Sequence, residues 1–266
     1  MKKIWVVFGL IFVCITALAH SVEWYVYGSL YQTTTCDAGD SITPPTAPAK
    51  YGYTFDKWEP AYKRLEYIES TGEQYIDTGI YLDYTKDFRV TGIIKNPSNN
   101  RRKVIFGNFT NNNNMSFSLE FASNTQDGLT GNGIRVYFSS GYSQSTDALP
   151  IDTDINIDFV YTANTKSFVL TCVANGQTYT LSGTDSNIPD ITSNETLCMF
   201  LDKRLVTISN GLIIKSMSFT QETNIQSFVP AKNNSNAIGM YDTVSGTFFT
   251  NQGTGQFIAG PEVGGL

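Results

Sequence analysis

Three aspartates on one predicted strand are the residues whose spacing comes nearest to a catalytic pattern. They lie in the run Asp152-Thr-Asp154-Ile-Asn-Ile-Asp158, where side-chain alternation would place all three on the same face. Paired carboxyl groups can cleave glycosidic bonds with retention when they are about 5–5.5 Å apart. Asn156 interrupts the series and no glutamate belongs to it, so we interpret Asp152 and Asp154 as loop residues that lead into a strand. No catalytic residue is predicted.

The histidine content narrows the possible reactions further. His20 is the single histidine of the chain, so a Ser-His-Asp or Cys-His site and a His-ligated metal are disfavoured. No glycine-rich run stands between a strand and a helix to hold a phosphate group. A Glu/Asp pair brought together from distant strands is the hydrolytic alternative, which would make the protein a glycoside hydrolase with a divergent acid pair.

Aromatic and polar residues that lie near one another suggest ligand binding instead. Ligand sites typically combine apolar or aromatic surface with a few polar groups, and carbohydrate sites use the aromatic ring as a stacking platform. Tyr137 and Tyr142, near Arg135 and Asn108, are the candidate ligand-binding residues. The alternative is that they pack within strands or lie on ordinary exposed loops.

Two oxygen-rich segments could supply calcium ligands. They are Asp83 to Asp87, and Asn124 with Asp127, since calcium prefers carboxylate and carbonyl oxygens. Ordinary solvated loops are the alternative. The prediction therefore assigns no cofactor and no metal-binding residue.

The beginning of the chain has the features of an export signal. Met1-Lys-Lys is followed by an apolar run from Ile4 to Leu18 that ends in Ala17-Leu-Ala19, the pattern of a cleaved secretory signal peptide over residues 1–19. An uncleaved membrane anchor is the alternative, although a spanning helix needs roughly 20 apolar residues. We expect a secreted, cell-surface or periplasmic protein without stable membrane insertion after cleavage.

Charge and cysteine content bear on partners and cross-links. Without Lys2 and Lys3, 16 of the 18 basic residues remain against 24 acidic ones, a net charge of −8, which argues against nucleic acid as a partner. Export permits disulfides. A Cys172–Cys198 disulfide that leaves Cys36 free, and three reduced thiols, are both compatible with the sequence.

The elements that would position these residues are strands. Ile155, Ile157 and Phe159 alternate cleanly, and Asn175-Gly176 between two β-rich runs predicts a hairpin with a type I′ turn. A closing hairpin is expected over residues 238–251. About a dozen short strands without helical crossovers predict an all-β, two-sheet jelly-roll sandwich.

Residues 20–60 are predicted to form a small β module. Val22 to Tyr31 favours one strand, and a run rich in Pro, Thr and Ala follows it. Tyr51-Gly-Tyr-Thr-Phe-Asp-Lys-Trp58 resembles the second half of the internalin-type B repeat of bacterial surface proteins. The resemblance implies a stalk or cap. Tyr53, Phe55 and Trp58 would form the core of this module.

Two motifs near the ends of the remaining chain carry a second resemblance. Leu65 to Gly79, with Phe228-Val-Pro230 and Gly239 to Gly246, is similar to secreted bacterial and phage-associated proteins with a concanavalin A-like (laminin G-like) lectin/glucanase domain. The resemblance implies a jelly roll over residues 61–262, followed by a tail at 263–266, with a concave face and both ends joined along adjacent edge strands. Met240, Tyr241, Phe248 and Phe249 would then close the core.

The resemblance implies no reaction, because this fold carries lectins, adhesion domains and glycosidases alike. Its glycosidases share a Glu-x-Asp-x-Glu strand motif that this sequence lacks. We therefore predict an exported, non-catalytic binding or adhesion protein that recognises a glycan or a host or cell-surface protein. The alternatives are the hydrolase with a divergent acid pair and a purely structural surface component.

Overall fold

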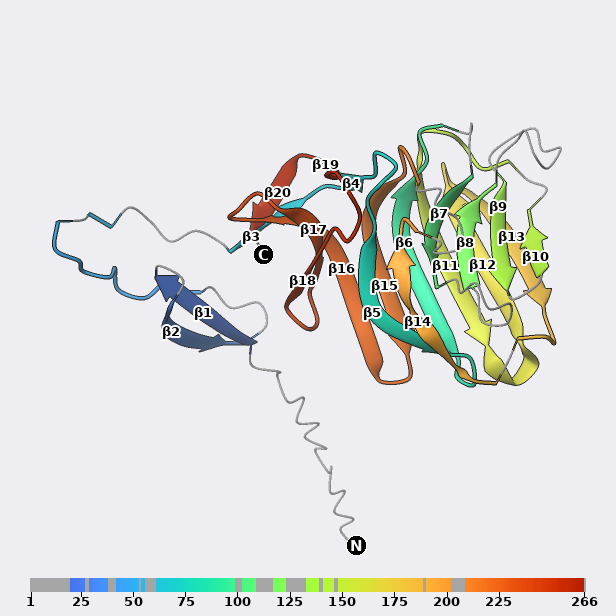
Figure 1. The fold of residues 1–266 in the computed structure, drawn as a ribbon, viewed down its shortest axis with the longest axis horizontal. Coiled ribbons are helices and arrows are strands. Elements are labelled where there is room, and N and C mark those ends of the chain that lie inside the picture. The colour runs from blue at the N-terminus through green and yellow to red at the C-terminus, as the bar shows by residue number, and fades with distance from the viewer. Residues whose placement is uncertain are drawn as a thin grey trace, which may run out of the picture. The chain divides into compact units, whose positions relative to one another are not determined.

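The computed structural model describes residues 20–26, 29–37, 42–52, 54–55, 61–98, 102–108, 117–122, 133–138, 141–145, 148–188, 190–201 and 209–265. The chain divides into two compact units, Met1–Glu59 and Pro60–Leu266 (Figure 1). The predicted signal peptide lies outside the described residues. Within the described part, no helix is both long enough and apolar enough to cross a membrane.

The first unit contains a β-hairpin where the sequence analysis expected one strand. β1 (His20–Val26) and β2 (Ser29–Cys36) pair antiparallel, from His20 opposite Cys36 to Val26 opposite Ser29. The indole nitrogen of Trp24 donates a hydrogen bond to Thr34 Oγ1 across the pair. The single strand predicted from Val22 to Tyr31 is thus wrong, because the chain reverses inside that range. Tyr53 and Trp58 of the repeat-like run lie outside the described residues.

The second unit is a sandwich of two antiparallel sheets (Figure 1). The smaller sheet has the order β10-β9-β8-β7-β14-β5, and the main path of the larger one is β13-β12-β11-β6-β15-β16-β17-β18. The all-β, two-sheet architecture predicted from the sequence is confirmed. The strands of the smaller sheet are β5 (Ile76–Asp83), β7 (Lys103–Gly107), β8 (Phe117–Phe121), β9 (Ile134–Phe138), β10 (Gly141–Gln144) and β14 (Thr192–Met199).

The strands at the two ends of this unit also pair within the larger sheet. β3 pairs with β16 and β20, and β4 pairs with β15 and β19. Its strands are β3 (Tyr62–Leu65), β4 (Ile68–Glu69), β6 (Phe88–Lys95), β11 (Asp154–Thr162), β12 (Ser167–Ala174), β13 (Gln177–Thr184), β15 (Ile213–Gln221), β16 (Asn224–Asn233), β17 (Ile238–Asp242), β18 (Thr247–Thr250), β19 (Ile258–Ala259) and β20 (Glu262–Gly265). A 3₁₀ turn, η1 (Ala163–Thr165), joins β11 to β12.

Aromatic rings from both sheets interlock in the core. Phe117 of the smaller sheet lies 5.5 Å from Phe88 and 5.0 Å from Phe159 of the larger one, measured between ring centroids. All three are at most 2% exposed. Burying a side chain of this size contributes about 1.5–3 kcal/mol. The alternation predicted for β11 is confirmed, since Ile155, Ile157 and Phe159 are all buried.

Two predicted hairpins are present. Asn175 and Gly176 join β12 to β13 with φ angles of 51° and 75°, as a type I′ turn requires. β17 and β18 form the closing hairpin, with Asp242 opposite Thr247. Asp242 is fully buried and accepts hydrogen bonds from the backbone of Ser227 (2.8 Å) and from Ser245 Oγ (2.6 Å). A buried carboxylate therefore organises the closing turn.

Residues 73–75 of the first end motif contact residues 251–254, which follow the second end motif. Gln74 Nε2 donates to the carbonyl of Thr254 at 3.0 Å, and Asn251 Oδ1 accepts from the backbone of Tyr75 at 3.1 Å. Gly253 packs so closely on this segment that an added Cβ would lie 1.9 Å from the carbonyl oxygen of Glu73. The junction leaves no room for a side chain there.

The four residues expected to close the core divide between the two faces of the hairpin. Met240 is fully buried in the core and Phe249 packs against it. Tyr241 and Phe248 are cross-strand partners whose rings lie 4.9 and 5.1 Å from the ring of Tyr62. Strand alternation explains the difference, because neighbouring residues point to opposite faces.

Candidate ligand-binding site at the edge of the sandwich

Three of the four candidate residues come together on β9 and β10. Tyr137 and Tyr142 are direct cross-strand partners, and Arg135 pairs with Gln144. Ile134, Val136 and Phe138 belong to the core, so Arg135 and Tyr137 point to the outer face of the smaller sheet. The Tyr137 and Tyr142 rings are stacked, with centroids 6.4 Å apart and planes at 15°.

The Arg135 side chain contacts the exposed ring of Tyr142. Its guanidinium carbon lies 4.2 Å from the centroid of the Tyr142 ring, a cation–π contact worth about 0.5–2 kcal/mol. Its Nε and Nη2 atoms donate to Gln144 Oε1 at 3.0 and 2.6 Å. Arg135 is only 7% exposed, whereas Tyr142 is 56% exposed. The ring is thus fixed in place and still available to a ligand.

A buried carboxylate on the next strand fixes Arg135 in turn. Glu120 of β8 lies opposite Arg135 in the sheet register and is fully buried. Its Oε1 is 3.5 Å from Arg135 Nη1, and its Oε2 accepts a hydrogen bond from Arg102 Nε at 2.5 Å. A buried charge is tolerated when it is paired and hydrogen-bonded. Glu120, Arg102 and Arg135 therefore form a rigid support below the two tyrosine rings.

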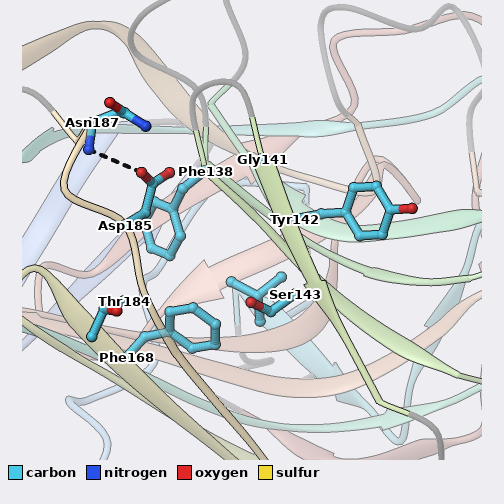
Figure 2. A pocket seen from close by; sticks show the side chains of 9 residues that line it. Phe138, Gly141, Tyr142, Ser143, Phe168, Thr184, Asp185 and Asn187 are labelled. Atoms are coloured by element: carbon cyan, nitrogen blue, oxygen red, sulfur yellow. Dashed lines mark hydrogen bonds between the residues drawn. The ribbon is translucent and has the colours of Figure 1, made fainter.

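A small pocket lies on the other side of β10 (Figure 2). Phe138 and Phe168 are almost fully buried beneath it. Its volume is about 140 Å³, and it is lined by Val136, Phe138, Gly141, Tyr142, Ser143, Phe168, Thr184, Asp185 and Asn187. Sites that enclose a whole ligand typically measure about 300–1,000 Å³, so this pocket fits a substituent rather than a complete saccharide.

The ring of Tyr142 lies on the other side of the edge strand β10 from the pocket, although Tyr142 also belongs to the pocket lining. Figure 2 shows the Tyr142 ring pointing away from the pocket, while Ser143 lies on the side of Phe168. Alternation along β10 accounts for both directions. The segment after β13 supplies the polar rim: Asp185 Oδ1 accepts a hydrogen bond from the backbone of Asn187 at 2.9 Å.

Ser143, Phe168, Thr184, Asp185 and Asn187 were not among the candidates from the sequence. The polar run from Thr184 to Asn187 directly after a predicted strand was the available signal. What the sequence does not show is that β10 and β13, the end strands of two different sheets, lie next to each other. That neighbourhood depends on how the sheets close the sandwich.

Asn108 lies apart from the other candidates. It is fully buried, and its Oδ1 accepts hydrogen bonds from the Tyr84 hydroxyl and the backbone of Phe117, both at 3.0 Å. Because it follows β7 on the core side, its side chain fixes two core groups. The structure gives Asn108 a role in packing.

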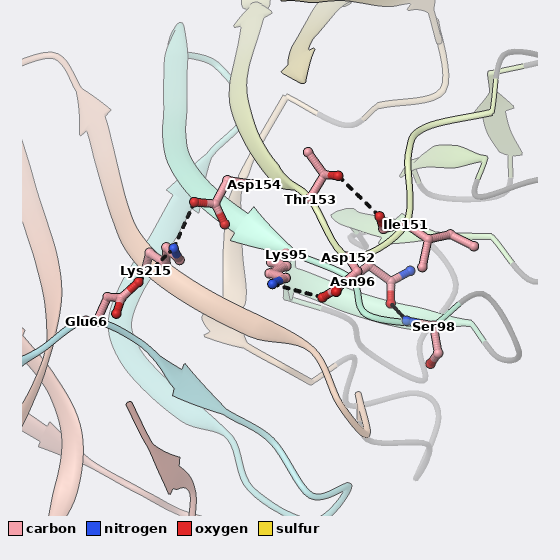
Figure 3. A network of polar contacts seen from close by, with 9 residues as sticks. All are labelled: Glu66, Lys95, Asn96, Ser98, Ile151, Asp152, Thr153, Asp154 and Lys215. Carbon is pink, nitrogen blue, oxygen red and sulfur yellow. Dashed lines mark hydrogen bonds and ion pairs between the residues drawn. The ribbon is translucent and has the colours of Figure 1, made fainter. Parts of the chain in front are cut away.

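The three aspartates on and before β11 lie on the outer side of the larger sheet. Asp152 pairs with Lys95 at 2.8 Å and Asp154 with Lys215 at 2.8 Å, as Figure 3 shows, and Asp158 accepts two hydrogen bonds from Arg89. Asp152 is a loop residue, as interpreted from the sequence, and Asp154 is the first residue of β11. Asp185 is the single carboxylate among the described residues that line the pocket.

Where the structure describes the candidate calcium loops, their carboxylates accept hydrogen bonds from other groups of the protein. Asp83 Oδ1 accepts hydrogen bonds from the backbone and hydroxyl of Thr85, and Asp87 Oδ1 accepts one from the backbone of Ala163. Within the described ranges, no group of three His, Cys, Asp or Glu side chains could hold a metal ion. Asn124 and Asp127 lie outside those ranges.

The sequence left a Cys172–Cys198 disulfide and reduced thiols open, and in the structure no disulfide joins these two cysteines. Cys172 belongs to the core on the larger sheet. Cys198 stands on the smaller sheet between Leu197 and Met199, which both face the core, so its side chain points the opposite way. The two sulfur atoms therefore lie on different sides of the smaller sheet. Burial raises the pKa of the Cys172 thiol to about 12.

No protein-family model matches this sequence, and no curated protein does. Among solved structures, the chain is similar to a candidate carbohydrate-binding protein from Bacteroides ovatus, with 11% identity and a TM-score of 0.48 over 74% of this chain and 62% of that one. The chain thus spans less than two thirds of that protein.

Two further solved structures are similar to this chain at comparably low identity and TM-score. The CBM40 module of the Ruminococcus gnavus IT-sialidase, bound to α2,3-sialyllactose, shares 14% identity with a TM-score of 0.41 over 59% of this chain and 90% of that one. Domains LG4-5 of mouse laminin α1 share 11% with a TM-score of 0.42 over 75% and 47%. At this distance, the function must be inferred from the residues of the chain itself.

Proposed function

We propose that this chain is an exported, non-catalytic protein that binds carbohydrate through the face formed by β9 and β10. The observation that carries the proposal is the Tyr142 ring, which is 56% exposed but held by Arg135 at 4.2 Å and by the stacked Tyr137. A large aromatic ring costs less conformational entropy on binding when it is already fixed. Such a platform suits the apolar face of a sugar ring.

The pocket beside the platform gives the second half of a saccharide site. A sugar that stacks on Tyr142 at the edge of the sandwich could place a substituent over β10, toward Ser143, Asp185 and Asn187. These groups offer hydroxyl, carboxylate and amide partners for sugar hydroxyl groups. The small volume requires most of the ligand to remain outside the pocket, as in binding to the end of a glycan chain.

The hydrolase alternative finds less support at this place. A retaining mechanism needs two carboxyl groups about 5–5.5 Å apart, and Asp185 is the single acid among the described residues that line the pocket. The outer-face aspartates of β11 are paired with Lys95, Lys215 and Arg89. A purely structural role would not require the Tyr142 ring to be held by Arg135 and Tyr137.

A glycan array of the mature protein, probed with and without calcium, tests the proposal. We expect binding to a restricted set of glycans under both conditions, because Asp185 is the single carboxylate among the described residues that line the pocket. A blank array in both conditions would contradict carbohydrate binding and leave adhesion to protein or a structural role. Release of reducing sugar from a bound glycan would overturn the non-catalytic assignment. Export would be checked by N-terminal sequencing, which should begin at His20.

A further inference from the structure

A buried lysine contacts a buried asparagine where the two sheets meet. Lys103 is the first residue of β7 and is 1% exposed, and Asn96 follows β6 and is fully buried. Lys103 Nζ donates a hydrogen bond to Asn96 Oδ1 at 2.7 Å and another to Ser98 Oγ at 3.0 Å. The amine is therefore held directly against the side-chain amide of Asn96.

A second hydrogen bond polarises the side-chain carbonyl group of Asn96. The backbone N–H of Ser98 donates to the same Asn96 Oδ1 at 3.3 Å, as Figure 3 shows. Two donors on one carbonyl oxygen withdraw electron density from its carbon and stabilise negative charge that develops on the oxygen. The arrangement favours attack by the amine on Asn96 Cγ.

A carboxyl group lies near this pair without a direct ion pair to Lys103, so its side chain has to rotate toward the amine before a proton can be exchanged. A Cβ on Gly211 would lie 3.5 Å from Lys103 Nζ and 3.9 Å from Glu69 Oε1, so both atoms border the same small space. Burial lowers the pKa of Lys103 to about 8, although the negative charge of Glu69 acts in the opposite direction. At pH 7, a pKa near 8 leaves roughly a tenth of the amine neutral and nucleophilic.

We propose that Lys103 and Asn96 form an intramolecular isopeptide bond, with Glu69 as the proton carrier. The neutral amine attacks Asn96 Cγ, and the Glu69 carboxylate takes a proton from the resulting ammonium nitrogen. Glu69 then returns this proton to the amide nitrogen, the C–N bond of the asparagine breaks, and ammonia leaves. One amide replaces another, so no oxidant, reductant or cofactor is needed. Burial of both side chains keeps water away from the intermediate.

The bond would join the two layers of the sandwich. Asn96 follows a strand of the larger sheet and Lys103 begins a strand of the smaller one. A covalent link there prevents the two strand ends from separating, which non-covalent packing alone does not do. In an exported protein it would resist mechanical force and proteolysis, and it would leave the tyrosine face of β9 and β10 untouched.

Peptide mapping of the folded, full-length protein tests the bond directly. Trypsin does not cleave after an acylated lysine, so we expect peptide Asn96–Arg101 to be recovered joined to peptide Lys103–Arg135, lighter than their sum by one ammonia. Recovery of free Asn96–Arg101, together with cleavage after Lys103, would overturn the proposal and leave Lys103 as a hydrogen-bonded core residue.

The variant Glu69→Gln separates the chemistry from the packing. It keeps the shape of the side chain but cannot carry the proton, so the linking rate should fall by about 100-fold or more while circular dichroism stays unchanged. Undiminished linkage in Glu69→Gln would remove Glu69 from the mechanism. Lys103→Met provides the unlinked reference for the peptide map.

Discussion

Glu120 lies opposite Arg135 in the register of β8 and β9, and the charge pair that they form is almost completely buried beneath the exposed Tyr142. This relationship connects the interior of the smaller sheet to its surface. Glu120 orients Arg135, Arg135 orients Tyr142, and the tyrosine ring is the part that a ligand can reach. Changes to the buried charge should therefore affect stability and binding together.

The variant Glu120→Gln tests this connection. It leaves Arg102 and Arg135 with a neutral partner, so we expect a loss of about 3–5 kcal/mol in the free energy of unfolding, as when one partner of a buried ion pair is removed. Glu222→Gln is the matched control, because the Lys86–Glu222 pair is exposed and such pairs contribute about 0–1 kcal/mol. Urea denaturation measures both, and equal losses would contradict the buried support.

Asn108→Ala distinguishes packing from ligand binding. The change leaves the Tyr84 hydroxyl and the Phe117 N–H without their buried acceptor, which should cost about 1–3 kcal/mol for each group. Glycan affinity of the folded variant should remain within about twofold of the wild type, because Asn108 is fully buried. A loss of glycan affinity at unchanged stability would instead show that Asn108 contributes to ligand binding.

Gly253→Ala tests the contact between residues 73–75 and residues 251–254. The new Cβ would meet the carbonyl of Glu73 at 1.9 Å, so the backbone has to move, and we expect a loss of about 1–3 kcal/mol. Gly141→Ala is the control, since its Cβ would meet nothing within 4 Å. Thermal unfolding followed by circular dichroism compares them. Equal midpoints would contradict the close packing of Gly253 on Glu73.

Thiol labelling tests whether Cys172 and Cys198 are reduced thiols. Cys172 and Cys198 are fully buried, and the raised pKa of Cys172, about 12, keeps it protonated at pH 8. Its contribution to stability is therefore fully present below the unfolded pKa of about 9 and is lost as the pH rises toward 12. Both thiols should resist iodoacetamide in the native protein and react in urea without reductant. Labelling that requires reductant would indicate a disulfide.

Local and periodic features of the sequence predicted much of the fold. Asn175-Gly176 requires positive φ angles, so its hairpin followed from residue chemistry, and the alternation of Ile155, Ile157 and Phe159 followed from strand geometry. The reversal between Val26 and Ser29 was missed although Gly28 and Ser29 interrupt the strand-forming residues of the run from Val22 to Tyr31. Glycine and serine are common turn residues, so this reversal could have been predicted from the composition.

The candidate site was predictable only in part, because some of its residues meet only through contacts between the two sheets. Tyr137, Tyr142 and Arg135 lie close in sequence on two adjacent strands, so a hairpin brings them together. Asp185 and Asn187 reach β10 only through the closure of the sandwich, which no local pattern encodes. The placement of Asn108 in the core depends on the register of β7, which shifts irregularly between Val104 and Phe106.

The affinity of Tyr142→Ala for an array-positive glycan tests the central claim most directly. Tyr81→Ala is the matched control, because Tyr81 is 55% exposed on β5, the opposite edge strand of the same sheet. Titration calorimetry should show a loss on the order of 10- to 30-fold for Tyr142→Ala, typical of a central aromatic contact, and no change for Tyr81→Ala, with both variants folded. Equal affinities for wild type and Tyr142→Ala would contradict carbohydrate binding at the face of β9 and β10.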